Sequence, residues 1–137
     1  MHNTAHLLKY AWQFALTPYS WGGDDPTGLD CSGFVVECLK SIGKLKAHED
    51  LSADGLWKRF KLYEHHGKPK PCCLAFWFTG DRATHVAICL DDEFCLTAEG
   101  GGSTTHTPED AANANAFIKL RPIYGIRKAN PKFINLF

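Results

Sequence analysis

The sequence lacks an excess of charge of either sign: 15 lysine and arginine residues balance 15 aspartate and glutamate residues. Without a basic excess or a long basic run, nucleic-acid binding is not expected as the main function. No tract has the composition of a disordered tail, and hydrophobic residues make up 45% of the 137 positions. A chain of this length and composition predicts one globular domain over residues 1–137.

Two kinds of targeting segment are also missing. No apolar run approaches the roughly 20 residues that a membrane-spanning helix needs, so membrane insertion is not expected. The N-terminal segment, MHNTAHLLKYAWQFALT, has no basic start followed by a continuous apolar core and a small-residue cleavage site. We therefore expect synthesis in the cytoplasm without a signal peptide, and six reduced cysteines rather than a disulfide framework.

The most informative stretch, Tyr19 to Ile42, reads YSWGGDDPTGLDCSGFVVECLKSI and has a cysteine where two patterns meet. A turn-rich loop precedes Cys31, and apolar residues at helical spacing follow it. Cys31 is therefore expected in the first turn of a helix, with Asp30 or the residue before it as the cap. The N-terminus of a helix favours negative charge, which would shift the thiol toward the thiolate. Taken alone, such a cysteine is also compatible with a small core residue.

The remaining pattern separates into helices and then strands. Helical spacing predicts a first helix from residue 3 to about 16 and a third helix that begins at Ser52 or Asp54 and ends by Gly67. From Cys73 onward the period changes, and strands are expected at residues 74–78, 84–90, 94–99, 117–120 and 123–126. This order predicts an α+β fold with an antiparallel sheet.

The segment around Cys31 resembles the nucleophile segment of the NlpC-type cell-wall cysteine peptidases, which belong to the papain-like superfamily. The matching residues are Tyr19, Trp21, Gly22, Gly23, Gly28, Asp30, Cys31, Ser32, Gly33 and Phe34. The resemblance implies a papain-like fold in which N-terminal helices, including the one that begins at Cys31, pack on a C-terminal antiparallel sheet. One departure is Pro71-Cys72-Cys73-Leu74, where these peptidases commonly have Pro-Gly-Asp-Leu.

A cysteine nucleophile needs a base, and histidine is suited to that role because its pKa lies near neutrality. His85 opens the expected strand THVAICL, and the resembling peptidases carry His-Val-(Gly/Ala)-Ile at this place. Their third residue, which orients the imidazole, is usually His, Asn or Gln, and Thr97 stands at that position. Thr97 and Glu99 share a strand face, and we favour Glu99 because a carboxylate both accepts the imidazole N–H and stabilises its charged form. Thr97 is kept as the alternative.

Further expectations come from the resemblance. Tyr19 is expected beside the nucleophile to bind the carbonyl oxygen or the substrate backbone, and Asp30 and Ser32 to hold the free amino end of a peptide stem. The implied reaction is hydrolysis of an amide bond in bacterial peptidoglycan stem peptides, at γ-D-glutamyl-diaminopimelate or -lysine, through a Cys31 acyl-enzyme. Peptidoglycan is the implied partner, and no cofactor is expected.

The missing export signal favours a phage lysin, a virion component or an injected antibacterial effector with its immunity protein, acting on the wall after release, delivery or injection. Three alternatives stay open: an acyltransferase or other amidase on the same scaffold, a catalytically inactive tail-assembly or binding domain, and a zinc-binding module. The zinc site would use His65, His66, Cys72 and Cys73. It is disfavoured because the two cysteines are adjacent, without the usual two-residue separation, and no metal site is expected.

Overall fold

The computed structural model describes residues 2–16, 24–25, 28–99, 117–125 and 127–137. Its centre is a six-stranded antiparallel sheet with the strand order β3-β8-β4-β5-β6-β7. These strands are β3 (Glu64–His65), β4 (Leu74–Thr79), β5 (Arg82–Cys89), β6 (Phe94–Glu99), β7 (Phe117–Pro122) and β8 (Lys132–Ile134). A separate pair, β1 (Asp24–Asp25) and β2 (Gly28–Leu29), leads into the second helix. The α+β prediction is confirmed.

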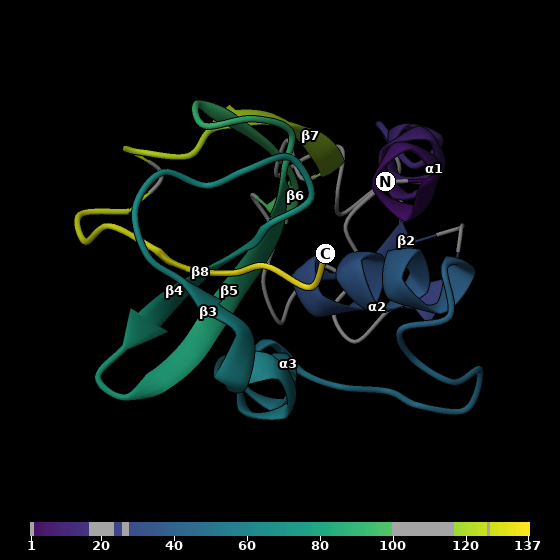
Figure 1. Cartoon of the computed structure of the whole chain (residues 1–137), viewed down its shortest axis with the longest axis horizontal. Helices are drawn as coiled ribbons and strands as arrows, with labels where there is room; N and C mark the ends of the chain where they lie inside the picture. Colours follow the sequence, from purple (N-terminus) through teal and green to yellow (C-terminus); the bar gives the residue numbers. More distant parts are fainter. Residues whose placement is uncertain (1, 17–23, 26–27, 100–116, 126) are drawn as a thin grey trace.

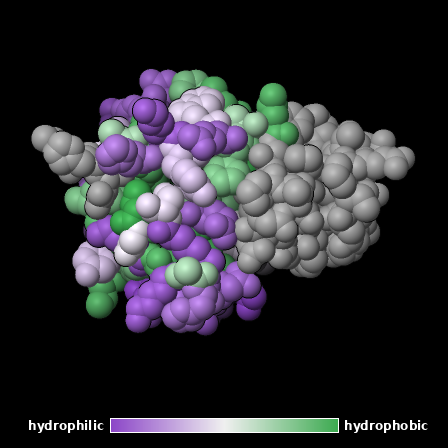
Figure 2. Space-filling model, turned by 90° about the vertical axis from the view of Figure 1, so that its right-hand side faces the viewer, coloured by the Kyte–Doolittle hydropathy of each residue, from purple (hydrophilic) through white to green (hydrophobic). Residues whose placement is uncertain are grey.

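In the part of the chain that the structure describes, three α-helices accompany the sheet: α1 (His2–Trp12), α2 (Cys31–Ser41) and α3 (Ala53–Phe60), the last continued by a 3-10 turn, η1 (Lys61–Tyr63). Helices α1 and α2 lie together on one side of the sheet, and α3 lies near the β4–β5 end of it (Figure 1). None of the described helices has the length and hydropathy needed to cross a bilayer. The surface on the α1–α2 side is mostly hydrophilic where it is described, with hydrophobic atoms in separate groups (Figure 2).

Buried side chains form two layers, one on each face of the sheet. The larger layer joins α1, α2 and α3 to the sheet through residues such as Leu7, Phe34, Leu56 and Phe76, which are all fully buried. The smaller layer lies on the opposite face and includes three cysteines, Trp77, Ile123 and Phe133. Strand β4 contributes to both layers, which explains why its sequence, LAFWFT, is almost continuously apolar.

The predicted strands at 74–78, 84–90, 94–99 and 117–120 are confirmed as β4 to β7 with small changes in their ends. The strand expected at 123–126 is wrong, because residues 123–125 turn away from β7 with Gly125 at φ +102° and residue 126 lies outside the described part. The apolar side chain of Ile123, which suggested a strand, is instead buried in the smaller layer, and its N–H donates to the carbonyl of Glu93. Strand β8 was not predicted, since three residues show no clear alternation.

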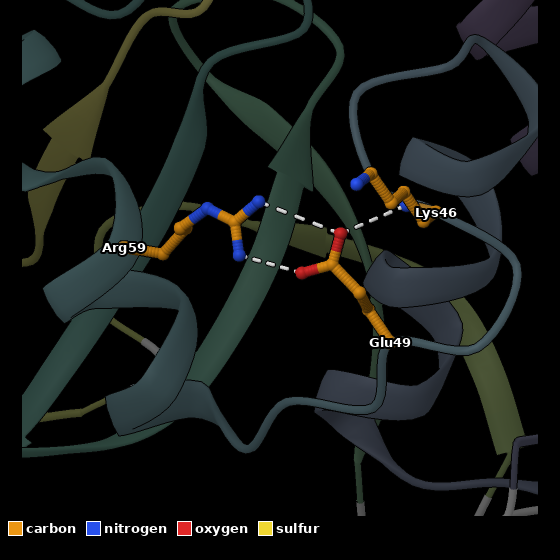
Figure 3. A network of polar contacts seen from close by, with 3 residues as sticks. All are labelled: Lys46, Glu49 and Arg59. Carbon is orange, nitrogen blue, oxygen red and sulfur yellow. Dashed lines mark hydrogen bonds and ion pairs between the residues drawn. The ribbon is translucent and has the colours of Figure 1, made fainter.

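A polar network fixes the connection between α2 and α3. Glu49 accepts hydrogen bonds from the backbone N–H of Lys46 and from both terminal nitrogens of the Arg59 guanidinium (Figure 3). Just beyond it, Ser52 caps α3 by accepting from the N–H of Gly55, as predicted for one of the two candidate caps. The start of α3 is therefore held by two contacts, the ion pair between Glu49 and Arg59 and the Ser52 cap at its first turn.

Candidate active site

Cys31 is the first residue of α2, at the junction where the sequence placed it. Asp30 caps this helix: its Oδ1 accepts from the backbone N–H of Gly33 at 2.6 Å and from the Ser32 hydroxyl at 3.3 Å. The apolar stripe after Cys31, at Phe34, Val35, Cys38 and Leu39, packs into the larger core layer. The capping bonds and the buried stripe together fix the direction in which Cys31 leaves the helix.

The expected shift of Cys31 toward thiolate is wrong for the free protein. Backbone N–H groups of Val86, Ser32 and Cys31 itself do favour the thiolate, but burial outweighs them, and the charge of Asp30 adds to the opposing effect. The net result raises the pKa of the Cys31 thiol to about 11. The prediction that Cys31 lies at a helix N-terminus is confirmed. The stabilisation that this position gives to the thiolate is smaller than the cost of burying its charge.

The thiol of Cys31 lies where strands β5 and β6 separate. Their pairing covers Ile88 with Leu96 and Cys89 with Cys95, and continuing that register would pair Val86 with Ala98. Instead, the N–H of Val86 bonds the Cys31 sulfur, and the Val86 carbonyl lies 3.5 Å from the hydroxyl of Thr97. Where the two strands separate, the N–H and the carbonyl of Val86 are therefore available to Cys31 and to Thr97.

His85 immediately precedes Val86 and is bonded by Thr97, whose Oγ1 lies 2.8 Å from His85 Nε2. Both side chains are buried, with Thr97 fully inaccessible. Thr97, the alternative that the sequence analysis kept for the third site residue, is therefore the one within hydrogen-bond distance of the imidazole. Glu99 ends β6 opposite Phe117, but its side chain is not among those the structure describes, so its preferred role stays a prediction.

The environment of His85 favours the neutral imidazole. Burial, followed by the positive charge of Arg127, lowers the pKa of His85 to about 3. The ring also packs against Trp77, the residue opposite it on β4, with ring centroids 5.3 Å apart. With the thiol pKa raised and the imidazole pKa lowered, the resting pair at neutral pH is a thiol and a neutral base.

A bulge at Thr84 sets the direction of β5 just before His85. Trp77 pairs with His85 and Phe78 with Ala83, so Thr84 is the extra residue on this strand. Next to the bulge, the N–H of Ala83 donates to Asp54 of α3 at 3.0 Å, and Asp54 also pairs with Lys58 at 2.9 Å. Bulges of this kind re-aim side chains beside functional sites, and here α3 holds the bulge in place.

A pocket of about 320 Å³ opens beside the nucleophile. Its walls come from the start of α2, the start of α3 and the first residues of β5: Asp30, Cys31, Ser32, Ser52, Ala53, Arg82, Ala83 and Thr84. The expected substrate contacts Asp30 and Ser32 are therefore brought together with Cys31, whereas Tyr19 lies outside the described residues. The sequence analysis named Asp54 only as a candidate helix start and did not name Arg82. The position of Arg82 between a turn and the strand of His85 is the signal that could have identified it.

Three of the four residues of the alternative zinc site make other contacts. His65 lies on β3 with Nε2 at 2.8 Å from the carbonyl of Lys68, and the buried Cys72 thiol donates to the carbonyl of Thr4. The Cys73 sulfur accepts from the backbone N–H of Lys70. Within the described part of the chain, no group of three or more histidine, cysteine or acidic side chains has the geometry to hold a metal ion.

Known protein families and solved structures resemble most of this chain. The family model described as the NlpC/P60 family matches residues 16–121. Protein P54 of Enterococcus faecium is 30% identical over 112 residues, which are 81% of this chain and 19% of P54. This chain thus spans about a fifth of the length of that relative.

Solved structures show the same fold. The NlpC/p60 domain of the peptidoglycan hydrolase SagA superposes with a TM-score of 0.64 at 22% identity, covering 97% of this chain and 98% of that one. The peptidoglycan hydrolase RipB from Mycobacterium tuberculosis gives a TM-score of 0.69 at 20% identity, covering 98% and 64% of the two chains. The family match, together with a cysteine at a helix start and a histidine bonded on the facing sheet, leads to one conclusion: the chain belongs to the NlpC/P60 family of cysteine peptidases.

Proposed function

We propose that this domain is an endopeptidase that hydrolyses an amide bond in peptidoglycan stem peptides, at γ-D-glutamyl-diaminopimelate or -lysine. The observation that carries the proposal is a pair of hydrogen bonds. The backbone N–H of Val86, the residue after His85, bonds the Cys31 sulfur, and Thr97 Oγ1 lies 2.8 Å from His85 Nε2. Two structural neighbours that share the fold bear the name peptidoglycan hydrolase, which supports this class of substrate.

Thr97 selects the tautomer of His85 in this proposal. A hydroxyl has a single proton, and the Val86 carbonyl at 3.5 Å from Oγ1 is placed to accept it. Thr97 then accepts the N–H of His85 Nε2 at 2.8 Å. The lone pair lies on Nδ1 as a result, and Nδ1 is the atom that takes the proton of the Cys31 thiol.

The reaction follows from these positions. As His85 Nδ1 removes the thiol proton, the Cys31 sulfur attacks the scissile carbonyl carbon, and the backbone N–H of Cys31 stabilises the oxyanion. The imidazolium then protonates the leaving amine, and the carbon–nitrogen bond breaks to leave a thioester on Cys31. His85 next takes a proton from water, the resulting hydroxide attacks the thioester, and the thiol and a carboxylic acid are released.

Asp30 and Ser32 are proposed to hold the free amino end of the stem peptide, and their place on the pocket wall beside Cys31 supports this role. A role for Tyr19 at the carbonyl oxygen stays a prediction. So does delivery to the wall as a phage lysin, a virion component or an injected effector, with a virion protein or an immunity protein as partner. Sequencing the genes beside the native gene tests that last prediction, because each route requires different neighbouring genes.

The decisive experiment is mass spectrometry of the fragments released from purified peptidoglycan by the wild-type protein and by Cys31→Ala. Cys38→Ala is a matched control, because Cys38 lies on the same helix but is buried in the core, where it cannot reach substrate. We expect fragments with new glutamyl and amino ends from the wild type and from Cys38→Ala, and none from Cys31→Ala. Release that persists in Cys31→Ala, or no release from walls of several chemotypes, would contradict the proposal and favour a transferase or an inactive domain.

A further inference from the structure

The pocket beside Cys31 contains an arginine that the proposed reaction has not used. Arg82 is the first residue of β5 and is solvent-exposed, and its side chain lines the same pocket of about 320 Å³ as the nucleophile. Arginine presents a planar fork of N–H donors that matches a carboxylate, and it keeps its charge at every physiological pH. This side of the pocket is therefore suited to a negatively charged group.

The two helix ends at the pocket add to that preference. Cys31 and Ser32 are the first residues of α2, and Ala53 is the first residue of α3, with Ser52 as its cap. The first N–H groups of a helix have no partner within the helix, and the aligned peptide dipoles place partial positive charge there. Two such ends and the guanidinium of Arg82 thus line one pocket, together with the Asp30 carboxylate that caps α2.

The carboxylates near Arg82 are engaged with other groups. Asp54 pairs with Lys58 and accepts from the N–H of Ala83, and these contacts, with a smaller contribution from the charge of Arg82, lower its pKa. Asp30 caps α2 through Oδ1 and is the carboxylate proposed to hold the amino end of the stem peptide, so the pocket wall carries one acidic and one basic side chain. Among the described residues, Arg82 forms no ion pair, so its charge is available to a ligand in the pocket.

We propose that Arg82 forms a carboxylate subsite that receives the free α-carboxylate of the γ-linked glutamyl residue whose γ-carbonyl is attacked by Cys31. This inference rests on the proposed function and deepens it. A glutamyl residue joined through its side-chain carboxyl keeps an α-carboxylate a few bonds from the scissile carbonyl. If that group is amidated, the residue carries a neutral carboxamide there, which has one acceptor oxygen in place of two and loses the ion pair and the bidentate match to the guanidinium. The enzyme therefore distinguishes γ-linked D-glutamate from its α-amide.

The test compares two synthetic stem peptides that differ only at that group, L-Ala-γ-D-Glu-L-Lys and its α-amidated counterpart. For the wild type we expect kcat/KM to be about tenfold higher on the free carboxylate, the size of one charge-assisted hydrogen bond at a partly exposed site. Arg82→Gln should lower kcat/KM about tenfold on the carboxylate peptide and leave the amide peptide within about twofold. Arg82→Lys should keep part of the preference. Lys61→Gln, which removes an exposed charge from η1 outside the pocket, is the control and should behave like the wild type.

The outcomes separate the subsite from the proposed function. The subsite is supported if the wild type prefers the carboxylate peptide and Arg82→Gln removes that preference by lowering kcat/KM on the carboxylate peptide alone. An equal loss on both peptides assigns Arg82 a structural role and overturns the subsite, while hydrolysis itself still supports the proposed function. Wild-type cleavage of both peptides at the same rate likewise overturns the subsite alone. No Cys31-dependent cleavage of either peptide overturns the proposed function, and the subsite with it.

Discussion

Replacing Thr97 by valine removes the hydroxyl that bonds His85 and keeps the branching and nearly the volume of the side chain. In the native protein, Thr97 Oγ1 lies 2.8 Å from His85 Nε2, and both side chains are buried. Valine cannot accept the Nε2 proton. The effect should be largest when His85 holds the proton of Cys31, because the donor is then part of a charged imidazolium.

The magnitude follows from the cost of a buried donor that loses its acceptor, about 1–3 kcal/mol, with charged donors toward the upper end. A loss of about 2 kcal/mol in the transition state lowers kcat about 30-fold. Thr97 is fully inaccessible and cannot touch substrate, so KM should change by less than about twofold. The loss should therefore appear in kcat.

The assay is steady-state hydrolysis of a synthetic stem peptide by wild type, Thr97→Val and Thr97→Ser, with thermal unfolding of each protein as the folding control. Thr97→Ser keeps the hydroxyl and should stay within about threefold of the wild type. Glu99→Gln tests the competing assignment, since it should lower kcat only if Glu99 is the orienting residue. Wild-type kcat in folded Thr97→Val, or a loss in Thr97→Ser as large as that in Thr97→Val, would refute the tautomer argument.

Three further predictions follow from the pKa of Cys31, the pKa of His85 and the backbone conformation of Cys72. Because the pKa of Cys31 is about 11, its alkylation by iodoacetamide should accelerate about tenfold per pH unit from pH 7 to 10, measured by mass spectrometry of its peptide; a constant rate between pH 6 and 8 would indicate a preformed thiolate. Burial holds the pKa of His85 at about 3, below the roughly 6.5 of an unfolded histidine. The unfolded chain therefore binds the proton first as the pH falls, and the free energy of unfolding should decrease from pH 7 to 5 in urea titrations, less steeply in His85→Gln; equal decreases would argue against it. Cys72 has φ +74° and a buried thiol that donates to the Thr4 carbonyl, so both Cys72→Gly and Cys72→Val lose that bond; in the same titrations the β-branched Cys72→Val should be less stable than Cys72→Gly by about 1 kcal/mol, and the reverse order would exclude backbone strain.

The positions of Cys31 and His85 could be predicted because both depend on local pattern. A turn-rich loop followed by a helical apolar stripe places Cys31 at a helix start, and the structure has α2 begin at that residue. Alternation after a turn places His85 near the start of a strand, and β5 begins three residues earlier, at Arg82. These features need no knowledge of distant contacts.

The third residue and the charge of the thiol could not be derived in this way. The choice between Thr97 and Glu99 depends on where β5 and β6 stop pairing, which the sequence does not encode locally. The pKa of Cys31 depends on how much of the protein covers it, and burial reverses the shift expected from the helix end. Both properties arise from tertiary packing.

The sequence departs from the family pattern at Pro71-Cys72-Cys73-Leu74 and at Thr97, and the two departures have different consequences. The Cys73 N–H bonds the Lys70 carbonyl across a turn that keeps Pro71 at its second position and holds Cys72 at φ +74°, where the resembling peptidases have glycine. Cys72 and Cys73 then both face Cys89, which accepts from one and donates to the other. Backbone bonds to β5 thus impose a conformation that the side chain disfavours. At Thr97 the departure concerns the side chain itself, because its hydroxyl lies at hydrogen-bond distance from His85 Nε2.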